Sequence, residues 1–504
     1  MDLLQNLALG FSVALTPINL LYCLVGVTLG TFVGVLPGVG PLAGVAMLLP
    51  TTYVLPPAAA VIMLAGIFYG AQYGGSTTSI LVNMPGDASA VVTCIDGHAM
   101  ARQGRAGPAL AISAIGSFFA GCVATVVIAV FAPFLTDLAL KFGPTEYFAL
   151  LTLGLVTAST LSHGSIVNAL AMVAVGLLLG IVGTDVQTST LRFTFDFPAL
   201  ADGVNLVAVA IGLFGFSHVI ANLDSMSRRD LHQSEIKRLM PSKADLKASW
   251  KAILRGTGIG SLLGVLPGGG AVLGSFVSYM VEKRISRTPE RFGHGAIEGV
   301  AGPESANNAA SQTSFIPLLT LGIPPNPVIA LIGGAMMIQG IAPGPEVITR
   351  QPEFFWAIVA SMWLGNMMLL VLNLPLIGIW VRMLRIPYGY LYPSIVLFSC
   401  IGIYSVNNSA FDVMTAAFFC LLGYIFLKLD CPPGPLLLGF ILGPMMEENL
   451  RRAMLLSHGD PTVFVREPIS LVLLLTAAAL VIVAVAPAIR RKRQEVFVDE
   501  RSMQ

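Results

Sequence analysis

A short motif occurs twice in the chain, and each copy interrupts an apolar segment with proline and glycine. Residues 34–40 read Gly-Val-Leu-Pro-Gly-Val-Gly, and residues 264–270 read Gly-Val-Leu-Pro-Gly-Gly-Gly. In a bilayer, the backbone groups freed by such a break need partners in protein or in a wet cavity. Paired breaks in two halves of a chain are typical of the binding site of a secondary transporter. The flanking glycines repeat in the same register, with Gly26, Gly30 and Gly44 matching Gly256, Gly260 and Gly274.

The composition places these segments in a membrane. The chain is 55% hydrophobic and 11% charged, with a mean hydropathy of +0.81, whereas soluble domains carry about 25% charged residues. We therefore predict an all-α polytopic membrane protein surrounded by membrane lipid. The formal net charge of +1 gives no reason to expect a nucleic-acid partner.

Basic residues divide the chain and predict its orientation. No Lys or Arg precedes Arg102, so the positive-inside rule places the N-terminus outside the cytoplasm. A net basic linker at 222–255 separates a first membrane repeat at 1–221 from a second, inverted repeat at 256–450. Residues 451–504 hold the last transmembrane helix and a basic tail, which predicts a cytoplasmic C-terminus.

A second broken segment follows each copy of the motif, at 83–87 and at 322–327. For 256–281, which has basic residues at both ends, a re-entrant hairpin is favoured over one kinked helix. At the second break of each half, a hairpin and a broken transmembrane crossing both remain open. Paired hairpins and broken helices favour an elevator-type movement of one substructure against a scaffold. The turns after the second breaks carry opposite charge, as inverted repeats predict: Arg102 and Arg105 in the first half, Glu346 and Glu353 in the second.

The remaining apolar segments approach the roughly 20 residues that a bilayer crossing needs. The predicted spans are 108–135, 145–161, 165–183 and 200–221 in the first half, then 354–381, 391–406, 411–427, 435–446 and 469–489.

Polar and small residues gather beside the breaks. Carbonyl and side-chain oxygens suit a hard cation such as Na⁺, while the N-termini of half-helices attract an anion. The predicted substrate-binding residues are Pro37, Gly38, Gly40, Ser76, Thr77, Thr78, Asn83, Gly268, Gly269, Gly270, Asn307, Asn308, Pro324 and Asn326. The predicted ion-coupling residues are Asp87, Glu304, Ser311, Thr313 and Thr320.

Among these candidates, the acidic residues are stronger predictions of a functional role than the hydroxyl residues. A hydroxyl in a membrane helix often only bonds its own backbone, whereas acids within a membrane, here Asp87 and Glu304, are costly and functional by default. Residues 1–101 and 292–349 contain no Lys or Arg, so no arginine clamp is expected. A coupling ion, Na⁺ or H⁺, would instead offset an anionic substrate, with no other cofactor. Asp96 and His98 are expected near the cytoplasmic surface, where solvent suffices.

The motifs together resemble a known family. The two Gly-Val-Leu-Pro-Gly copies, residues 73–86, residues 302–308 and residues 318–324 resemble the large membrane subunit of the tripartite tricarboxylate transporters, over essentially the whole chain. The resemblance implies a bacterial inner-membrane carrier that imports tri- or dicarboxylates such as citrate, coupled to Na⁺ or H⁺. It also implies two partners, a small four-helix membrane subunit and a periplasmic solute-binding protein. Where the family pattern often has Pro-Gly-Ser, this chain has Pro324, Pro325 and Asn326.

Two other classes of protein remain as alternatives. An ion channel would line its pore with the glycine-rich breaks and would conduct without saturation or a soluble partner. An intramembrane enzyme would use His and acidic residues, but no Ser/His or metal-ligand spacing stands out. The chain has no Gly-x-x-x-x-Gly-Lys-Ser/Thr motif, which disfavours an ATP-driven pump. The sequence leaves open which carboxylate is carried and the oligomeric state.

Overall fold

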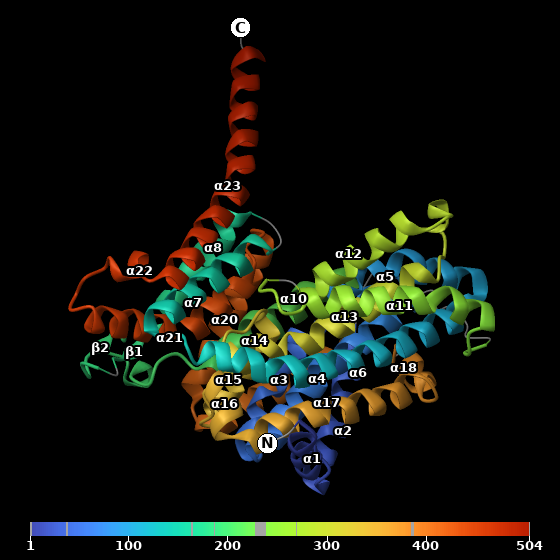
Figure 1. Cartoon of the computed structure of the whole chain (residues 1–504), viewed down its shortest axis with the longest axis horizontal. Helices are drawn as coiled ribbons and strands as arrows, with labels where there is room; N and C mark the ends of the chain where they lie inside the picture. The colour runs from blue at the N-terminus through green and yellow to red at the C-terminus, as the bar shows by residue number, and fades with distance from the viewer. Residues whose placement is uncertain are drawn as a thin grey trace. The chain divides into compact units, whose positions relative to one another are not determined.

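The computed structural model describes residues 3–36, 39–162, 165–185, 187–226, 238–268, 270–384 and 388–502. Its regular structure is helical, as predicted, apart from two short antiparallel strands, β1 (Gly183–Thr184) and β2 (Leu191–Arg192) (Figure 1). The chain forms two compact units, each of which draws on both predicted repeats. Unit 1 comprises Met1–Ala139 and Asn205–Tyr424, and unit 2 comprises Leu140–Val204 and Ile425–Gln504.

Unit 1 contains most of the helices, including all those that carry predicted site residues. Its first segment holds α1 (Leu3–Ala14), α2 (Pro17–Val35), α3 (Gly40–Leu48), η1 (Leu49–Val54), α4 (Pro57–Val82), η2 (Ala88–Ala90), α5 (Val91–Thr93), η3 (Cys94–His98), η4 (Ala101–Arg105) and α6 (Ala106–Ala139). Its second segment holds α9 (Leu206–Ala210), η6 (Ile211–Phe216), α10 (Ser217–Met226), α11 (Lys243–Leu263), α12 (Gly270–Ile285), η7 (Pro289–Arg291), α13 (Glu298–Thr313), α14 (Phe315–Leu321), α15 (Pro327–Ile338), α16 (Pro345–Arg350), α17 (Pro352–Asn373), α18 (Ile377–Met383), α19 (Tyr388–Asn407) and most of α20 (Ala410–Lys428).

Six of the described helices are long and apolar enough to cross a membrane, which agrees with a polytopic membrane protein. They cover Pro17–Val35, Pro57–Val82, Ala101–Ala139, Pro352–Asn373, Ala410–Lys428 and Pro468–Ala486.

The repeated glycines allow two pairs of helices to pack backbone against backbone. α2 packs along α4, and α11 packs along α13. A methyl group added at Gly30 would lie 2.4 Å from the carbonyl oxygen of Ile67, and one added at Gly260 would lie 2.1 Å from that of Ala306. Small residues permit such close approach between membrane helices. The matched series Gly26, Gly30, Gly34 and Gly256, Gly260, Gly264 therefore make equivalent contacts, with Met63, Ile67, Ala71 and with Gly302, Ala306, Ala310.

The second copy of the motif forms the tip of a helical hairpin. Gly264 near the end of α11 lies against Gly270 at the start of α12, and one turn back Gly260 lies beside Gly274. The two helices therefore run antiparallel and form a hairpin, not one kinked helix; its re-entrant position in the membrane stays a prediction. At the tip, the amide of Gly268 donates to the carbonyl oxygen of Pro325, 2.6 Å away.

The helices are also interrupted at both positions predicted for the second breaks. Asn83 follows the last residue of α4 and Gly322 follows the last residue of α14, both in the left-handed conformation with φ of 55° and 74°. Asp87 then precedes η2 and Asn326 precedes α15, and each side chain accepts a backbone hydrogen bond from the first turn that follows. These are the residue types and bonds of helix N-caps. Local capping thus stabilises the start of the helix that follows each break.

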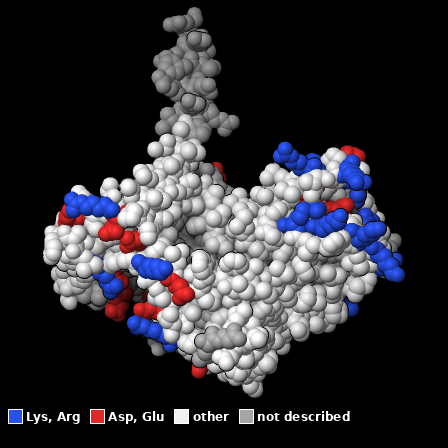
Figure 2. Space-filling view, viewed as in Figure 1, with Lys and Arg blue, Asp and Glu red and all other residues white. Residues whose placement is uncertain are grey.

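Charged side chains of unit 1 gather at the ends of α11 and α12, while much of the visible surface carries none (Figure 2). Within this group, Arg255 forms two hydrogen bonds of 2.7 and 2.6 Å to the buried carboxylate of Glu282. Asp245 caps α11 together with Ser242 and pairs with Arg105 at 2.6 Å. Partial burial raises the pKa of Asp245, but the hydrogen bonds from Ser242 and the charge of Arg105 outweigh it and lower the pKa below its ordinary value.

Unit 2 packs α21 against α7 and α8, and α23 against α7. An ion-pair network joins the β1–β2 loop to α21: Arg451 contacts Asp185 at 2.9 Å and Glu447 at 2.7 Å, and Arg192 contacts Glu447 at 2.6 Å. The elements of this unit are α7 (Pro144–Thr160), α8 (Ile166–Gly180), β1, β2, η5 (Pro198–Leu200), α21 (Pro433–Leu456), α22 (Val463–Arg466) and α23 (Pro468–Ser502).

Candidate functional site

Glu304 lies at the centre of a buried polar cluster in unit 1. Glu304 belongs to α13 and is 0% exposed. The Oγ of Ser76 on α4 lies 2.5 Å from Glu304 Oε2, and the hydroxyl of Thr93 on α5 donates to Oε1. None of the ion pairs among the described residues includes Glu304. The carboxyl group is therefore held by neutral hydroxyls.

Unpartnered amide atoms lie on the turns that follow Glu304. Asn307 is 0% exposed, and neither its Oδ1 nor its Nδ2 has a hydrogen-bond partner. Asn308 donates to Ser117 Oγ at 2.7 Å, but its Oδ1 is unpartnered, as is Oε1 of Gln312. Each buried polar atom without a partner costs about 1–3 kcal/mol, so native proteins rarely contain several together. These atoms mark a place where a polar ligand, an ion or water would bind.

A row of polar groups connects this cluster with Asp87. Ser89 Oγ lies 2.6 Å from Asp87 Oδ2 and 2.9 Å from Gln72 Oε1. The carbonyl oxygen of Gln72 lies 3.1 Å from the Oγ of Ser76, which in turn contacts Glu304. The row places the two predicted acidic residues at opposite ends of one set of contacts.

A cavity of about 380 Å³ lies at the Asp87 end of this row. Its lining includes Gly40 at the start of α3, Gly86 and Asp87 from the second break, and His218 from α10. The cavity thus brings together residues from both breaks of the first half. A free carboxylate ligand here would face the negative charge of Asp87 unless a bound cation or proton reduced that charge.

The two breaks of the second half also meet, through the bond between Gly268 and Pro325. Pro324 is buried beside this contact, while Asn326 is partly exposed as the cap of α15. Gly270 begins α12. The predicted residues Pro37, Gly38 and Gly269 lie outside the described residues.

Four predicted hydroxyl residues bond their own helices. Each donates to a backbone carbonyl of the preceding turn, which is the ordinary packing role of such residues in membrane helices. The oxygen of each hydroxyl keeps its acceptor capacity, so their ligand roles stay predictions. The bonds are Thr78 to Gly75 (3.0 Å), Ser311 to Asn307 (3.0 Å), Thr313 to Ala309 (3.1 Å) and Thr320 to Ile316 (2.8 Å). Thr77 is buried on α4, and Asn83 is exposed at its end.

The expectation that solvent satisfies Asp96 was wrong. Asp96 is 0% exposed, and its Oδ1 accepts three backbone hydrogen bonds of 2.8–2.9 Å from the segment that leads into α13. The hydroxyl of Tyr279 donates to Oδ2 at 2.9 Å. Two of the three donors are Gly293 and Gly295, whose φ angles of 90° and 99° favour glycine. The paired glycines were the only sequence signal of this contact, which fixes the start of the helix that carries Glu304.

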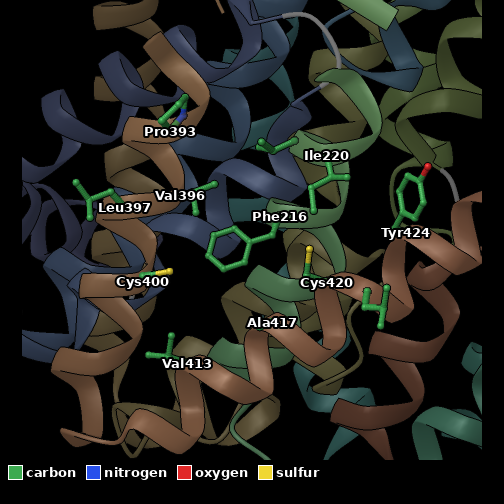
Figure 3. Close-up of a pocket in the computed structure, with 12 residues that line it drawn as sticks. Phe216, Ile220, Pro393, Val396, Leu397, Cys400, Val413, Ala417, Cys420 and Tyr424 are labelled. Carbon is green, nitrogen blue, oxygen red and sulfur yellow. The ribbon is translucent and has the colours of Figure 1, made fainter. Parts of the chain in front are cut away.

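A larger pocket in unit 1 has a different chemistry. It has a volume of about 830 Å³ and is lined by apolar side chains of η6, α10, α19 and α20. Figure 3 shows the ring of Phe216 between Val396 and Cys400 of α19 and Cys420 of α20. No charged residue lines this pocket, so the cluster around Glu304, and not this pocket, suits a charged solute.

Comparisons with known proteins identify the family of the chain. A family model described as "Tripartite tricarboxylate transporter TctA family" matches residues 20–438. Two proteins of Agrobacterium vitis are similar to this chain. One, named "Uncharacterized 52.8 kDa protein in TAR-I ttuC' 3'region", is 58% identical over 500 residues, which cover 99% of this chain and 100% of the relative. The other, named "Uncharacterized protein in TAR-II ttuC' 3'region", is 64% identical over 241 residues, or 48% of this chain and 100% of that protein.

No solved structure matches the chain. The family model nevertheless extends over both copies of the Gly-Val-Leu-Pro-Gly motif, both second breaks and the helix that carries Glu304. The chain therefore belongs to the TctA family of tripartite tricarboxylate transporters.

Proposed function

We propose that the chain is the large membrane subunit of a secondary transporter that imports tri- or dicarboxylates such as citrate, coupled to Na⁺ or H⁺. A periplasmic solute-binding protein delivers the substrate, and a small four-helix membrane subunit completes the assembly. The protein lies in the bacterial inner membrane, with its N-terminus in the periplasm and its C-terminus in the cytoplasm. Family membership supports the class of protein, and the basic residues of the linker support the orientation.

The observation that carries this proposal is the buried cluster on α13. Glu304 provides an acid, and the buried amide of Asn307 provides one free donor and one free acceptor. Asn308 Oδ1 and Gln312 Oε1 provide further acceptors, and α13 carries no Lys or Arg. A carboxylate bound there would be held by amide and hydroxyl donors. Because no basic side chain neutralises it, a co-transported cation would have to do so, which supports ion-coupled transport.

We further propose that the two halves are inverted repeats and that transport follows an elevator-type movement of the broken segments. Three observations support this proposal: the equivalent glycine contacts of α2 with α4 and of α11 with α13, the equivalent caps at Asp87 and Asn326, and the opposite charges of the corresponding turns. The predicted halves meet at the linker 222–255, of which residues 227–237 lie outside the described part of the chain.

The proposal is tested by transport in proteoliposomes that contain this chain and the small subunit. Radiolabelled citrate is added with and without the purified binding protein, under an inward Na⁺ gradient or an inward proton gradient. We expect saturable uptake that requires the binding protein and one of the two gradients; liposomes that lack the large subunit are the control. Flux that does not saturate and ignores the binding protein would identify a channel, and a chemically altered product would identify an enzyme.

A further inference from the structure

We infer that Glu304 carries the coupling proton, so that the ion transported with the carboxylate is H⁺ and its binding site is this side chain. The inference rests on the proposed function and specifies the coupling ion at the same site. It follows from the hydrogen-bond geometry around Glu304, from the charges that face it and from the unpartnered amide on the next turn.

The hydrogen bonds around Ser76 favour a protonated Glu304. A serine hydroxyl has one hydrogen to donate, yet Ser76 Oγ lies near two acceptors, the carbonyl oxygen of Gln72 at 3.1 Å and Glu304 Oε2 at 2.5 Å. If Glu304 holds a proton, it donates to Ser76 Oγ, and the serine hydrogen is free for Gln72. Both contacts are then hydrogen bonds. With an ionised Glu304, only one of the two can be.

The charges that face Glu304 also favour the neutral acid. Among the described residues, the titratable side chains that interact with Glu304 include Tyr73 on α4, Cys94 on η3 and Asp87 before η2. None of these groups can be a cation, and Asp87 is an acid. An ionised carboxylate that is buried without a cationic partner is strongly disfavoured, so a proton is the simplest way to neutralise Glu304 at full burial.

Asn307 would bind the substrate carboxylate close to Glu304. It follows Glu304 by one helical turn on the same face, and both atoms of its buried amide lack partners. Its Nδ2 can donate to a substrate carboxylate, which would then lie close to Glu304. Two adjacent carboxylates cannot both stay ionised at low cost. Substrate binding therefore raises the affinity of Glu304 for a proton, and by reciprocity the bound proton raises the affinity for the substrate.

The row from Asp87 through Ser89 and Gln72 reaches this site but does not conduct protons by itself. The amide of Gln72 has no titratable proton to pass on, so the row positions Asp87 and Glu304 relative to each other. We therefore assign proton binding to Glu304 and leave Asp87 its capping role.

The test compares wild type with Glu304→Gln, which mimics the protonated acid, in the reconstituted three-component system. Two assays are run: accumulation of labelled citrate driven by a proton gradient, and counterflow, in which labelled and unlabelled citrate exchange without a net driving force. We expect Glu304→Gln to lose gradient-driven accumulation and its remaining counterflow to be independent of pH, whereas counterflow by wild type depends on pH. Glu298→Gln, on the first turn of the same helix and paired with Arg291 at 3.4 Å, is the matched control and should behave as wild type.

A second measurement needs no variant. In the absence of Na⁺, a pH-sensitive dye inside wild-type vesicles should report acidification when citrate and the binding protein are added. Wild-type uptake that requires Na⁺ and moves no proton overturns the inference and leaves the proposed function intact. Accumulation by Glu304→Gln equal to that of wild type does the same. Absence of any carboxylate transport by wild type would overturn both.

Discussion

The close contact at Gly260 gives a sharp prediction about how the second hairpin is held. A Cβ atom at this position would lie 2.1 Å from the carbonyl oxygen of Ala306 and 2.7 Å from its Cα. Because real Cβ atoms keep at least 3.0 Å from other heavy atoms, α11 must move away from α13 by roughly 1 Å. Such overpacking costs about 1–3 kcal/mol, against a gain of about 1 kcal/mol for replacing a helical glycine by alanine. We expect Gly260→Ala to lose up to about 2 kcal/mol of unfolding free energy.

Gly258 on the same helix is the matched control, because nothing lies within 4 Å of a Cβ built there. Gly258→Ala should gain up to about 1 kcal/mol from helix propensity alone. Both variants are purified in detergent, and their unfolding is followed by tryptophan fluorescence during heating and during titration with a denaturing detergent. Gly30→Ala should behave like Gly260→Ala. Equal stability of Gly260→Ala and Gly258→Ala would refute the packing argument. A Gly30→Ala variant that is more stable than wild type, like Gly258→Ala, would refute the equivalence of the α2–α4 and α11–α13 contacts.

Three further predictions concern polar contacts outside the proposed site. Asp96→Ala leaves four hydrogen-bond donors without their acceptor and should cost at least about 2 kcal/mol in the same detergent titration. Glu290→Gln, at an exposed position of η7, should stay within about 0.5 kcal/mol of wild type. Arg255→Met leaves the buried carboxylate of Glu282 without its cation and should lower the melting temperature. Adding Glu282→Met should restore most of the lost melting temperature. A double variant that is as unstable as Arg255→Met would contradict this prediction. Because the pKa of Asp245 is lowered in the folded state, its stabilisation is complete above its ordinary value of 3.8 and is lost as pH falls through the lowered value. The difference in melting temperature between wild type and Asp245→Asn should thus stay constant from pH 7 to 5 and narrow below 3.8; a difference that already vanishes at pH 5 would argue against the lowered pKa.

The helices themselves were largely predictable, because proline, glycine and apolar runs mark their ends. The span predicted at 145–161 is α7 (Pro144–Thr160), and the one predicted at 411–427 is α20 (Ala410–Lys428). The last helix differs, since it was predicted to end near residue 489 but α23 continues to Ser502. Arg, Lys, Gln and Glu are good helix formers, so the end of an apolar segment need not be the end of the helix.

The contacts of the candidate site were less predictable than its residues. The sequence indicates polar side chains beside each break, but Ser76 and Thr93 come from one predicted half and Glu304 from the other. No local pattern states which hydroxyl meets which acid, because that depends on how α4, α5 and α13 pack. The burial of Asp96 was also not predictable from its neighbours in the sequence. Its burial depends on the return of residues 293–296, almost two hundred positions later in the chain.

The correspondence between the halves separates residues that build the frame from those that carry chemistry. Asn83 lies as far beyond Ala71 as Gly322 lies beyond Ala310, and both end a helix in the left-handed conformation. A position that has the same structural role in both halves, such as ending a helix, is explained by the fold alone. With the offset that matches Ala310 to Ala71, Glu304 corresponds to Ala65 in the first half. The packing of the helices therefore does not require an acid at this position. A buried carboxyl group at a position where the other half has alanine is costly to keep, and the proton that it can bind gives a reason for its presence.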